Sequence, residues 1–331
     1  MNVTRNFCTY FDKNYFLKGL CLINSLQKHC PRFIIFVLCL DKFTFDNLKK
    51  LNFDNVKLID LLTIEDSELL EAKSNRNIVE YYWTLTPCLP LFILKDNSNI
   101  EQITYLDSDI YFFSNPEIIF SEICESSIAI IEHRLPKIFS HLREMGQFCV
   151  EWVTIRNDKE GLKCLKHWKR ECINWCYDKK EKTRMGDQKY LDNWPKRYKN
   201  LHIIRNIGAG IAPWNYSMYN IKKGDDGMLT SDNTDLIYYH FHQFSLLKGN
   251  RFDWCSDFYK KQGPPPRSIY EIYQTEFESQ IEYLKFSLPG IKINKTSFFR
   301  NLFRRFVQNN LPNFLKKFIK AILSVFNLSI R

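Results

Sequence analysis

In the first half of the chain stands Ile103-Thr104-Tyr105-Leu106-Asp107-Ser108-Asp109, a short apolar run that ends in an acidic triplet. The run predicts a buried strand, and alternate residues beyond its end share one face, so Asp107 and Asp109 are expected to converge. Open α/β sheets bind ligands at the carboxyl ends of their strands. Two neighbouring carboxylates repel each other unless a cation lies between them, and Mg²⁺ or Mn²⁺ prefers such oxygen ligands. The triplet therefore predicts a metal site, although an isolated acidic pair is more often a solvated turn.

The flanking sequence alternates apolar runs with helical patterns. Strands are predicted at 6–10, 33–40, 56–61, 103–106, 127–131, 200–204 and 236–241, and helices at 15–29, 45–51 and 162–177. Alternation of this kind over the first 135 residues predicts an α/β layer with parallel strands. The apolar segment 78–93 is interrupted by Pro87 and Pro90 and receives no assignment.

Two further polar motifs follow the acidic triplet along the chain. The predicted strand at 236–241 carries His240, with His242 just beyond it, and an imidazole can complete an octahedral metal site. The alternative is a partly buried histidine satisfied by hydrogen bonds. Gly186-Asp187-Gln188 precedes a helix expected to start near Tyr190, and its alternative reading is an ordinary helix cap.

The composition is that of a globular protein, because 45% of the 331 residues are hydrophobic and none lies in a low-complexity segment. The net charge is +10, but residues 296–331 hold seven Lys or Arg and no acid, which leaves +3 for the rest. A general nucleic-acid surface would spread its charge over the body, so nucleic acid is not an expected partner. The eleven cysteines are scattered, and the pair Cys172 and Cys176 lacks the second pair that a zinc site needs. With no signal-peptide pattern at the start, we expect a reducing, cytoplasmic location.

The basic C-terminal segment, residues 296–331, carries two apolar stripes at helical spacing, separated near Asn309-Asn310. Neither stripe is apolar all round, which predicts a basic amphipathic helical tail that lies on an anionic membrane face rather than spanning the bilayer. The protein would then be peripheral on the inner face of the cell membrane. The alternative is that the stripes pack on the body of the protein or on a second subunit in a homo-oligomer.

Taken in order along residues 5–250, these elements resemble a known group of enzymes. The chain is similar to nucleotide-diphospho-sugar transferases of the GT-A fold, and most to the retaining group with glycogenin and the bacterial lipooligosaccharide galactosyltransferases. It also resembles bacterial polysaccharide-cluster relatives through residues 186–195 and Gly208-Ala209-Gly210-Ile211-Ala212-Pro213-Trp214-Asn215. The resemblance implies a Rossmann-like, mostly parallel mixed sheet flanked by helices, as one domain over residues 1–290, followed by the tail.

The resemblance also implies a role for each matching residue. In Phe11-Asp12-Lys13-Asn14-Tyr15, the side chains of Asp12 and Asn14 become contacts to the uridine or ribose of the donor. Asp107, Ser108 and Asp109 of the acidic triplet also become contacts to the donor. Asp107, Asp109 and His240 become ligands of Mn²⁺ or Mg²⁺, with Asp109 binding the metal most directly.

Catalysis in the resembling enzymes centres on an Asp-Gln pair, which Asp187 and Gln188 match. They would face the anomeric carbon and the acceptor. The implied activity is transfer of a sugar from a nucleotide diphosphate, UDP in the first place, to a glycan or lipid-linked glycan. The implied stereochemistry is retention, through front-face attack or a short-lived covalent intermediate. The biological setting implied is surface polysaccharide synthesis.

The chain departs from the pattern of these enzymes at four positions. Cys149 stands where Asn is usual, Glu151 where Gly is frequent, Trp83 where an Arg near the diphosphate is common, and Gln243 where Gly follows the histidine. These departures leave open a degenerate transferase that binds nucleotide sugar without turnover. A phosphatase of the haloacid-dehalogenase type also uses Asp-x-Asp after a strand, but it places the pair on the first strand, which makes it the weaker interpretation of this sequence.

Overall fold

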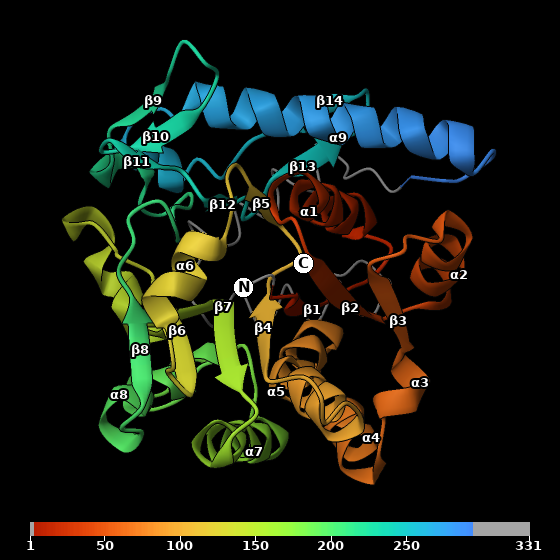
Figure 1. The fold of residues 1–331 in the computed structure, drawn as a ribbon, viewed down its shortest axis with the longest axis vertical. Helices are drawn as coiled ribbons and strands as arrows, with labels where there is room; N and C mark the ends of the chain where they lie inside the picture. The colour runs from red at the N-terminus through yellow and green to blue at the C-terminus, as the bar shows by residue number, and fades with distance from the viewer. Residues whose placement is uncertain (1–2, 294–331) are drawn as a thin grey trace, which may run out of the picture.

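Seven strands form the central sheet of the computed structural model, which describes residues 3–293 (Figure 1). Their spatial order is β3-β2-β1-β4-β7-β6-β8. The strands are β1 (Arg5–Phe11), β2 (Phe33–Cys39), β3 (Val56–Asp60), β4 (Gln102–Leu106), β6 (Ile128–Glu132), β7 (Phe148–Arg156) and β8 (Leu201–Ile204). The first four in chain order are parallel to one another, while β7 runs antiparallel to both of its neighbours, β4 and β6. The predicted mostly parallel mixed sheet is confirmed.

The strands predicted from the sequence begin and end within two residues of those observed, and the predicted helices within three. The nine-residue strand β7 was not predicted, although eight of its residues are buried. Its run of Phe, Cys, Val, Glu, Trp, Val and Thr shows no alternation, because both faces of the strand are covered. A carboxylate in the middle of such a run, Glu151, obscures the strand pattern.

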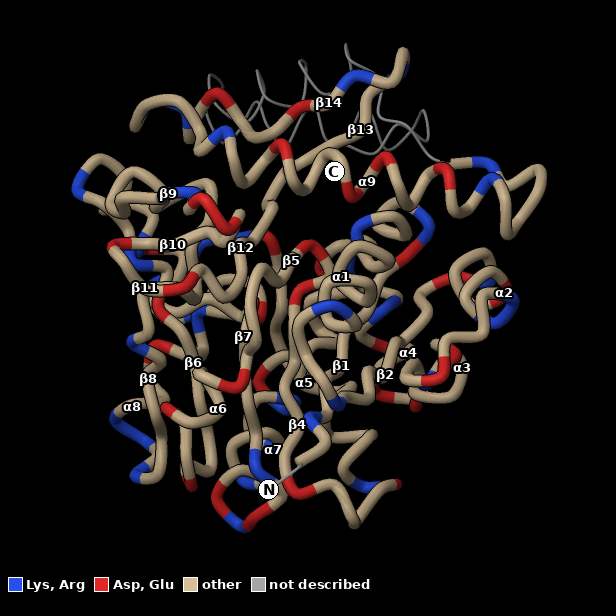
Figure 2. Tube along the Cα trace, turned by 45° about the horizontal axis from the view of Figure 1, so that its top comes forward, with Lys and Arg blue, Asp and Glu red and all other residues tan. Residues whose placement is uncertain are grey.

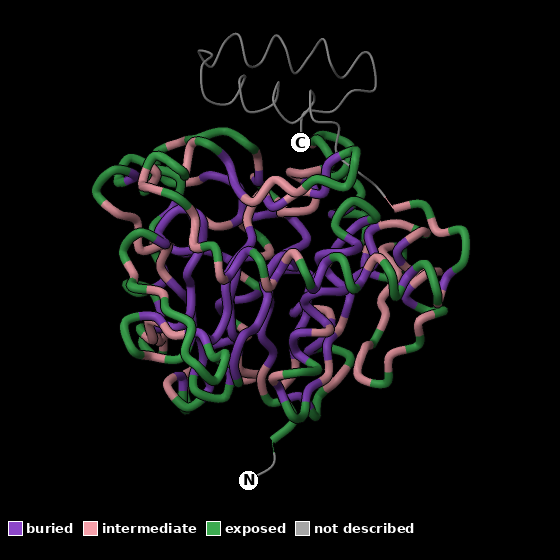
Figure 3. The backbone as a smooth tube through the Cα atoms, turned by 90° about the horizontal axis from the view of Figure 1, so that it is seen from above, coloured by how far each residue is buried: buried purple, intermediate pink, exposed green. Residues whose placement is uncertain are grey.

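Helices cover both faces of the sheet. They are α1 (Phe16–His29), α2 (Lys42–Leu51), α3 (Leu61–Ile64), α4 (Ser67–Ser74), α5 (Ile78–Asp96), α6 (Glu117–Ile123), α7 (Lys159–Asn174), α8 (Trp194–Arg197) and α9 (Arg267–Ser287). One hydrophobic cluster joins α5 and α7 to one face, and another joins α1 and α9 to the opposite face. Figure 3 shows the buried residues gathered along the central strands between these layers.

The segment left unassigned at 78–93 is the helix α5, with both Pro87 and Pro90 inside it. Proline removes a backbone donor from a helix interior, which is why this segment shows no clear helix pattern. The helix is fixed at its start by Asn77, whose side chain accepts from the amides of Val79 and Glu80 while Glu80 accepts from the Asn77 amide. Tight burial of its apolar residues between the sheet and α7 offsets the lost hydrogen bonds.

Short strands extend the fold beyond the main sheet. β5 (Ile110–Phe112) pairs with β12 (Tyr238–His240), β13 (Ser245–Leu247) pairs with β14 (Arg251–Asp253), and β9 (Ile221–Lys223), β10 (Leu229–Ser231) and β11 (Thr234–Asp235) form a three-stranded sheet. Four 3-10 helices are η1 (Lys137–Met145), η2 (Gln188–Asn193), η3 (Tyr216–Met218) and η4 (Tyr259–Gln262). The β5–β12 pair is antiparallel and follows β4 directly, so it lies at the carboxyl end of the main sheet.

Helix α9, which the sequence did not predict, lies across α1 (Figure 1). Its buried Glu276 accepts hydrogen bonds from Asn24 at 2.5 Å and from Tyr111 at 3.3 Å, and forms an ion pair with Lys28. Burial disfavours the charged form of this carboxyl, but Lys28 and the neighbouring hydrogen bonds outweigh it and lower the pKa of Glu276. The contact therefore holds α9 on α1 through an ionised carboxylate.

Residues 3–293 contain no helix that is both long and apolar enough to cross a membrane. Figure 2 shows acidic and basic residues interspersed over these residues in the view drawn. The predicted tail at 296–331 lies outside the described residues, so the expected domain division stays a prediction.

Candidate active site

The β5–β12 pair brings His240 beside the acidic triplet. His240 is the register partner of Ile110, and the amide of Phe241 donates to the carbonyl of Asp109 at 2.8 Å. As a result, Nε2 of His240 lies 3.0 Å from Oδ1 of Asp109 and 3.8 Å from Oδ2 of Asp107. Three residues predicted as metal ligands thus meet at one point, from segments far apart in the sequence.

A buried carboxylate fixes the imidazole from behind. Nδ1 of His240 lies 2.6 Å from Oε2 of Glu151, and the hydroxyl of Tyr238 donates to Oε1 of Glu151 at 3.1 Å. Histidines that bind metals are commonly held in this way, through the ring nitrogen that does not face the metal. Glu151 was not predicted as a site residue, since it stands where the resembling enzymes often have glycine. A signal was present, because an acid inside an apolar run needs a buried partner.

Lysine supplies a positive charge on the opposite side of the acidic pair. Lys18 of α1 forms an ion pair with Asp109, with Nζ 3.2 Å from Oδ2, and both side chains are less than a tenth exposed. Burial opposes ionisation of Asp109, but Lys18 and His240 outweigh it and hold the pKa of this carboxyl well below its usual range. The same contact with Asp109 raises the pKa of His240 against the opposing effect of burial.

The second carboxylate of the triplet behaves differently. Burial raises the pKa of Asp107 to about 6, and the charge of Asp109 adds to this effect, whereas His240 opposes it. The hydroxyl of Tyr105 donates to Oδ1 of Asp107 at 3.0 Å. Ser108, between the two acids, is buried. A positive charge close to Asp107, such as that of a bound cation, would favour the ionised form of its carboxyl group.

These side chains fit a divalent metal ion. Oxygen and nitrogen atoms of Asp109, His240 and His242 lie within 4.8 Å of one another, and so do ligand atoms of Asp107, Cys149 and His240. Carboxylates with imidazole suit Mn²⁺ and Mg²⁺. Burial raises the pKa of Cys149, which keeps this residue a thiol rather than a thiolate ligand. His242 was not among the predicted metal ligands, and its position beside Asp109 and His240 makes it a further candidate.

Asp187 lies near the acidic triplet with its carboxylate incompletely satisfied. Its Oδ2 is buried without a hydrogen-bond partner among residues 3–293, and its side chain does not cap η2. Burial raises the pKa of Asp187 to about 7, a nearby negative charge on Asp107 raises it further, and Thr86 opposes both. An unpaired polar atom at this depth marks a place where a ligand group is expected.

Elements around Asp187 hold it in place. The indole of Trp168 donates to the Asp187 carbonyl at 2.9 Å. Gly186 has a positive φ of 55°, and a Cβ there would lie 3.2 Å from the ring of Trp83. Gln188 is directed elsewhere, since its Nε2 donates to the carbonyl of Met145 in η1 at 3.2 Å. The structure therefore brings Asp187, but not the Gln188 amide, toward the acidic triplet.

The residues predicted to contact the nucleoside form a turn at the end of β1. The Asp12 carboxylate accepts from the backbone amide of Asn14 at 2.9 Å and from its Nδ2 at 2.7 Å. Strands β1 and β4 are parallel neighbours, so Asp12 and the acidic triplet lie at the same edge of the sheet. This edge is where ligands of open α/β sheets bind.

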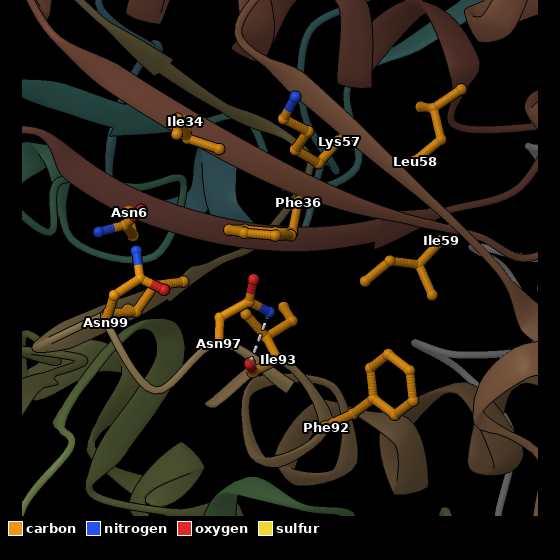
Figure 4. A pocket seen from close by; sticks show the side chains of 11 residues that line it. Asn6, Ile34, Phe36, Lys57, Leu58, Ile59, Phe92, Ile93, Asn97 and Asn99 are labelled. Carbon is orange, nitrogen blue, oxygen red and sulfur yellow. Dashed lines mark hydrogen bonds between the residues drawn. The ribbon is translucent and has the colours of Figure 1, made fainter. Parts of the chain in front are cut away.

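A hollow of about 290 Å³ with mixed polar and apolar lining lies apart from these residues (Figure 4). It is lined by residues near the amino ends of β1 and β2, by β3 and by the end of α5, including Asn6, Phe36 and Phe92. It shares no lining residue with the acidic site, and the amino ends of parallel strands lie at the opposite edge of the sheet. The hollow is not part of the candidate active site.

Comparison with known proteins matches this chain to one family and to two curated relatives. The model of the family described as "Glycosyl transferase family 8" matches residues 6–134. The uncharacterized protein YfnD of Bacillus subtilis (strain 168) is 32% identical over 290 residues, which cover 86% of this chain and 93% of YfnD. The chain belongs to glycosyltransferase family 8. The uncharacterized protein YfnF of the same organism is 27% identical over 290 residues, covering 86% of this chain and 95% of YfnF.

Among solved structures, this family 8 chain is similar to the galactosyltransferase LgtC in complex with donor and acceptor sugar analogs. The TM-score is 0.53 and the identity 14%, with 86% of this chain and 100% of the LgtC chain covered. At this identity the match shows the fold alone, which is the GT-A fold predicted from the sequence. Family membership makes the protein a glycosyltransferase and confirms the predicted class of enzyme.

Proposed function

We propose that this glycosyltransferase binds a UDP-sugar through a divalent ion, Mn²⁺ or Mg²⁺, and transfers the sugar with retention to a glycan or lipid-linked glycan. The observation that supports the metal is the approach of His240 Nε2 to both Asp109 and Asp107, with Glu151 holding the other ring nitrogen. When bound, the ion would neutralise charge on the departing nucleoside diphosphate.

The protein side chains divide the remaining tasks. Asp12 and Asn14, at the end of β1, bind the uridine or ribose, and Ser108 contacts the donor between the two metal-binding acids. Asp107, Asp109 and His240 would hold the ion, and His242 is an additional candidate ligand. Each of these roles fits the position of the residue at the carboxyl edge of the sheet.

Asp187 acts at the reacting carbon in this proposal, with Gln188 beside it on the acceptor side. The buried, unpaired oxygen of Asp187 supports its assignment. In the free protein Nε2 of Gln188 donates to the carbonyl of Met145, which leaves its second N–H and its amide oxygen to contact the substrate. The stereochemical proposal of retention rests on the resemblance to retaining enzymes.

We also propose that the protein binds the anionic membrane surface that carries its lipid-linked acceptor. Residues 296–331 carry seven cations and no acid, which suits a cytoplasmic enzyme that meets a lipid-linked acceptor of surface polysaccharide synthesis at the inner face of the membrane. A second copy of the chain is the alternative partner for the apolar stripes of this segment.

Changing Asp109 tests the metal proposal. We expect calorimetry to show UDP binding that weakens sharply when Mn²⁺ and Mg²⁺ are removed, and Asp109→Ala to abolish this metal dependence because it removes the most direct ligand. As a control, Asp46→Ala changes an acid on α2 that pairs only with Lys42 in its own helix, and should leave UDP binding intact. Metal-dependent UDP affinity that survives in Asp109→Ala would refute the assignment.

A separate assay of turnover addresses the alternative. If the protein binds nucleotide sugar but neither hydrolyses it nor transfers its sugar, the degenerate transferase is favoured.

A further inference from the structure

Lys18 is a buried cation that the proposed function does not use. It lies in the first turn of α1, directly after the Asp12–Asn14 turn, and its side chain is 8% exposed. Its ammonium lies 3.2 Å from Oδ2 of Asp109 and 4.3 Å from the centre of the Tyr15 ring. Oδ1 of Asp109 lies beside Nε2 of His240. Both carboxylate oxygens of Asp109 therefore already have a partner, Lys18 at Oδ2 and His240 at Oδ1.

A role in stability alone explains this arrangement poorly. Burying two charges costs about as much as their attraction returns, so a buried ion pair is weak evidence for stabilisation. Helix α1 otherwise buries mainly apolar side chains such as Phe16 and Leu20, which would pack equally well around an apolar residue at position 18. What Lys18 supplies is a positive charge at the point where two carboxylates would otherwise repel each other.

We propose that Lys18 competes with the divalent ion for Asp109, and that its ammonium turns to the diphosphate of the donor when the ion binds. This inference rests on the proposed function of the same site. Lys18 pairs with Oδ2 of Asp109, one of the two carboxylate oxygens through which this residue would bind the ion. Lysine has a flexible four-carbon stem and three donors, so its charge can move from a carboxylate to a nearby phosphate.

The exchange couples metal and nucleotide. In the nucleotide-free protein, Lys18 must leave Asp109 without a new anionic partner when the ion enters, so the ion binds weakly. With UDP present, the diphosphate offers Lys18 that partner, and the two ligands strengthen each other. Coupling of this kind is reciprocal for binding free energies.

The test measures Mn²⁺ binding to the full chain by electron paramagnetic resonance of free Mn²⁺, with and without UDP, after correction for the Mn²⁺–UDP complex in solution. In wild type, UDP should raise the affinity for Mn²⁺ by about tenfold or more, a coupling of ordinary size. Lys18→Met should raise the affinity for Mn²⁺ alone by about tenfold, because a like charge near the ion is gone. The same change should weaken UDP at saturating Mn²⁺ by about tenfold.

Two variants serve as controls. Lys28→Met removes a lysine from the same helix, where it pairs with Glu276 away from the acidic triplet, and should change neither affinity. Lys18→Arg keeps the charge and should retain wild-type coupling more closely than Lys18→Met. If Lys18→Met merely disturbed the packing of α1, the affinities for Mn²⁺ and for UDP would both fall. If Lys18 moves from Asp109 to the diphosphate, the affinity for Mn²⁺ alone rises while the affinity for UDP falls.

The outcomes separate this inference from the proposed function. If wild type binds Mn²⁺ and UDP together, Asp109→Ala abolishes that binding, and Lys18→Met changes neither affinity or lowers both, the inference about Lys18 is wrong and the metal site stands. If wild type binds no Mn²⁺ with or without UDP, the metal proposal and the inference both fail.

Discussion

Glu151 decides which nitrogen of His240 faces the acidic pair. Because its carboxylate engages Nδ1 while Asp109 engages Nε2, the ring cannot turn without breaking two buried hydrogen bonds. Gly210 lies against this group, and a Cβ there would lie 2.6 Å from Ile131 and 3.4 Å from Glu151. A residue that differs from the pattern of resembling enzymes therefore supports the candidate site from behind.

At the residue scale, Asp187 gives a pH-dependent prediction. Its pKa is raised from 3.8 to about 7, so between these values the folded chain binds a proton that the unfolded chain has lost. Stability from this group is therefore complete below about pH 4 and is lost as pH rises toward 7, by up to about 1.4 kcal/mol for each pH unit. Asp187→Asn, which is neutral at every pH, should gain stability relative to wild type between pH 5 and pH 7.

Urea unfolding of both proteins without metal or nucleotide checks this expectation. Asp192→Asn is a suitable comparison, because that acid is partly exposed and accepts from the backbone amide of Gln147. Parallel pH profiles for wild type and Asp187→Asn would show that Asp187 is ionised in the folded protein across this range.

Residue-level prediction from the sequence had a clear limit at Lys18 and Glu151. The acidic triplet and His240 could be found because each follows or ends an apolar strand, which is a local signal. Lys18 looks like an ordinary surface lysine of an amphipathic helix, and its burial depends on Asp109, 91 residues away. Glu151 needed a partner that the sequence could not name, since His240 meets it only through tertiary structure.

At the scale of elements, strands and helices with regular apolar patterns were predicted closely, while β7, α5 and α9 were not. β7 is covered on both faces and carries a charged residue, and α5 contains two prolines, so neither shows a regular pattern. Helix α9 buries polar residues such as Glu276 and Gln280 on the face that contacts the body. Its apolar stripe is therefore interrupted at the positions that matter most for docking.

The docking of α9 can be tested through Glu276. Glu276→Ala removes the acceptor shared by Asn24, Lys28, Tyr111 and Gln280, and takes their partner from the buried Tyr111 hydroxyl and Gln280 amide. We expect a loss of about 2–4 kcal/mol of unfolding free energy, in the range of a broken buried network. Chemical denaturation measures it. Glu282→Ala on the exposed side of α9, which pairs only with Lys285, should cost less than about 0.5 kcal/mol. Equal losses for both variants would mean that Glu276 does not anchor the helix.

On the scale of the whole molecule, the prediction for residues 296–331 concerns the membrane. Each cation near an anionic surface contributes about 1 kcal/mol, and seven are present. Full-length protein should therefore sediment with vesicles that contain phosphatidylserine at low salt. A chain that ends at Lys295 should lose this binding and keep its affinity for UDP, because the candidate site lies within residues 3–293.

Salt provides the control for the tail, since binding carried by charge weakens as ionic strength rises. Neutral phosphatidylcholine vesicles should bind the full chain less than anionic ones. If the full chain ignores anionic vesicles at low salt while the shortened chain changes its oligomeric state, the stripes of residues 296–331 pack on protein instead.

The pairing of β5 with β12 also sets the order in which the protein matures. Asp109 leaves the ribosome long before His240, and strands that are so far apart in the sequence pair late. A nascent chain that has emerged only through β5 contains both acids but neither the imidazole nor Glu151. Under the proposed function such a chain lacks one of the predicted metal ligands, so we expect metal-dependent sugar transfer only after translation has passed β12.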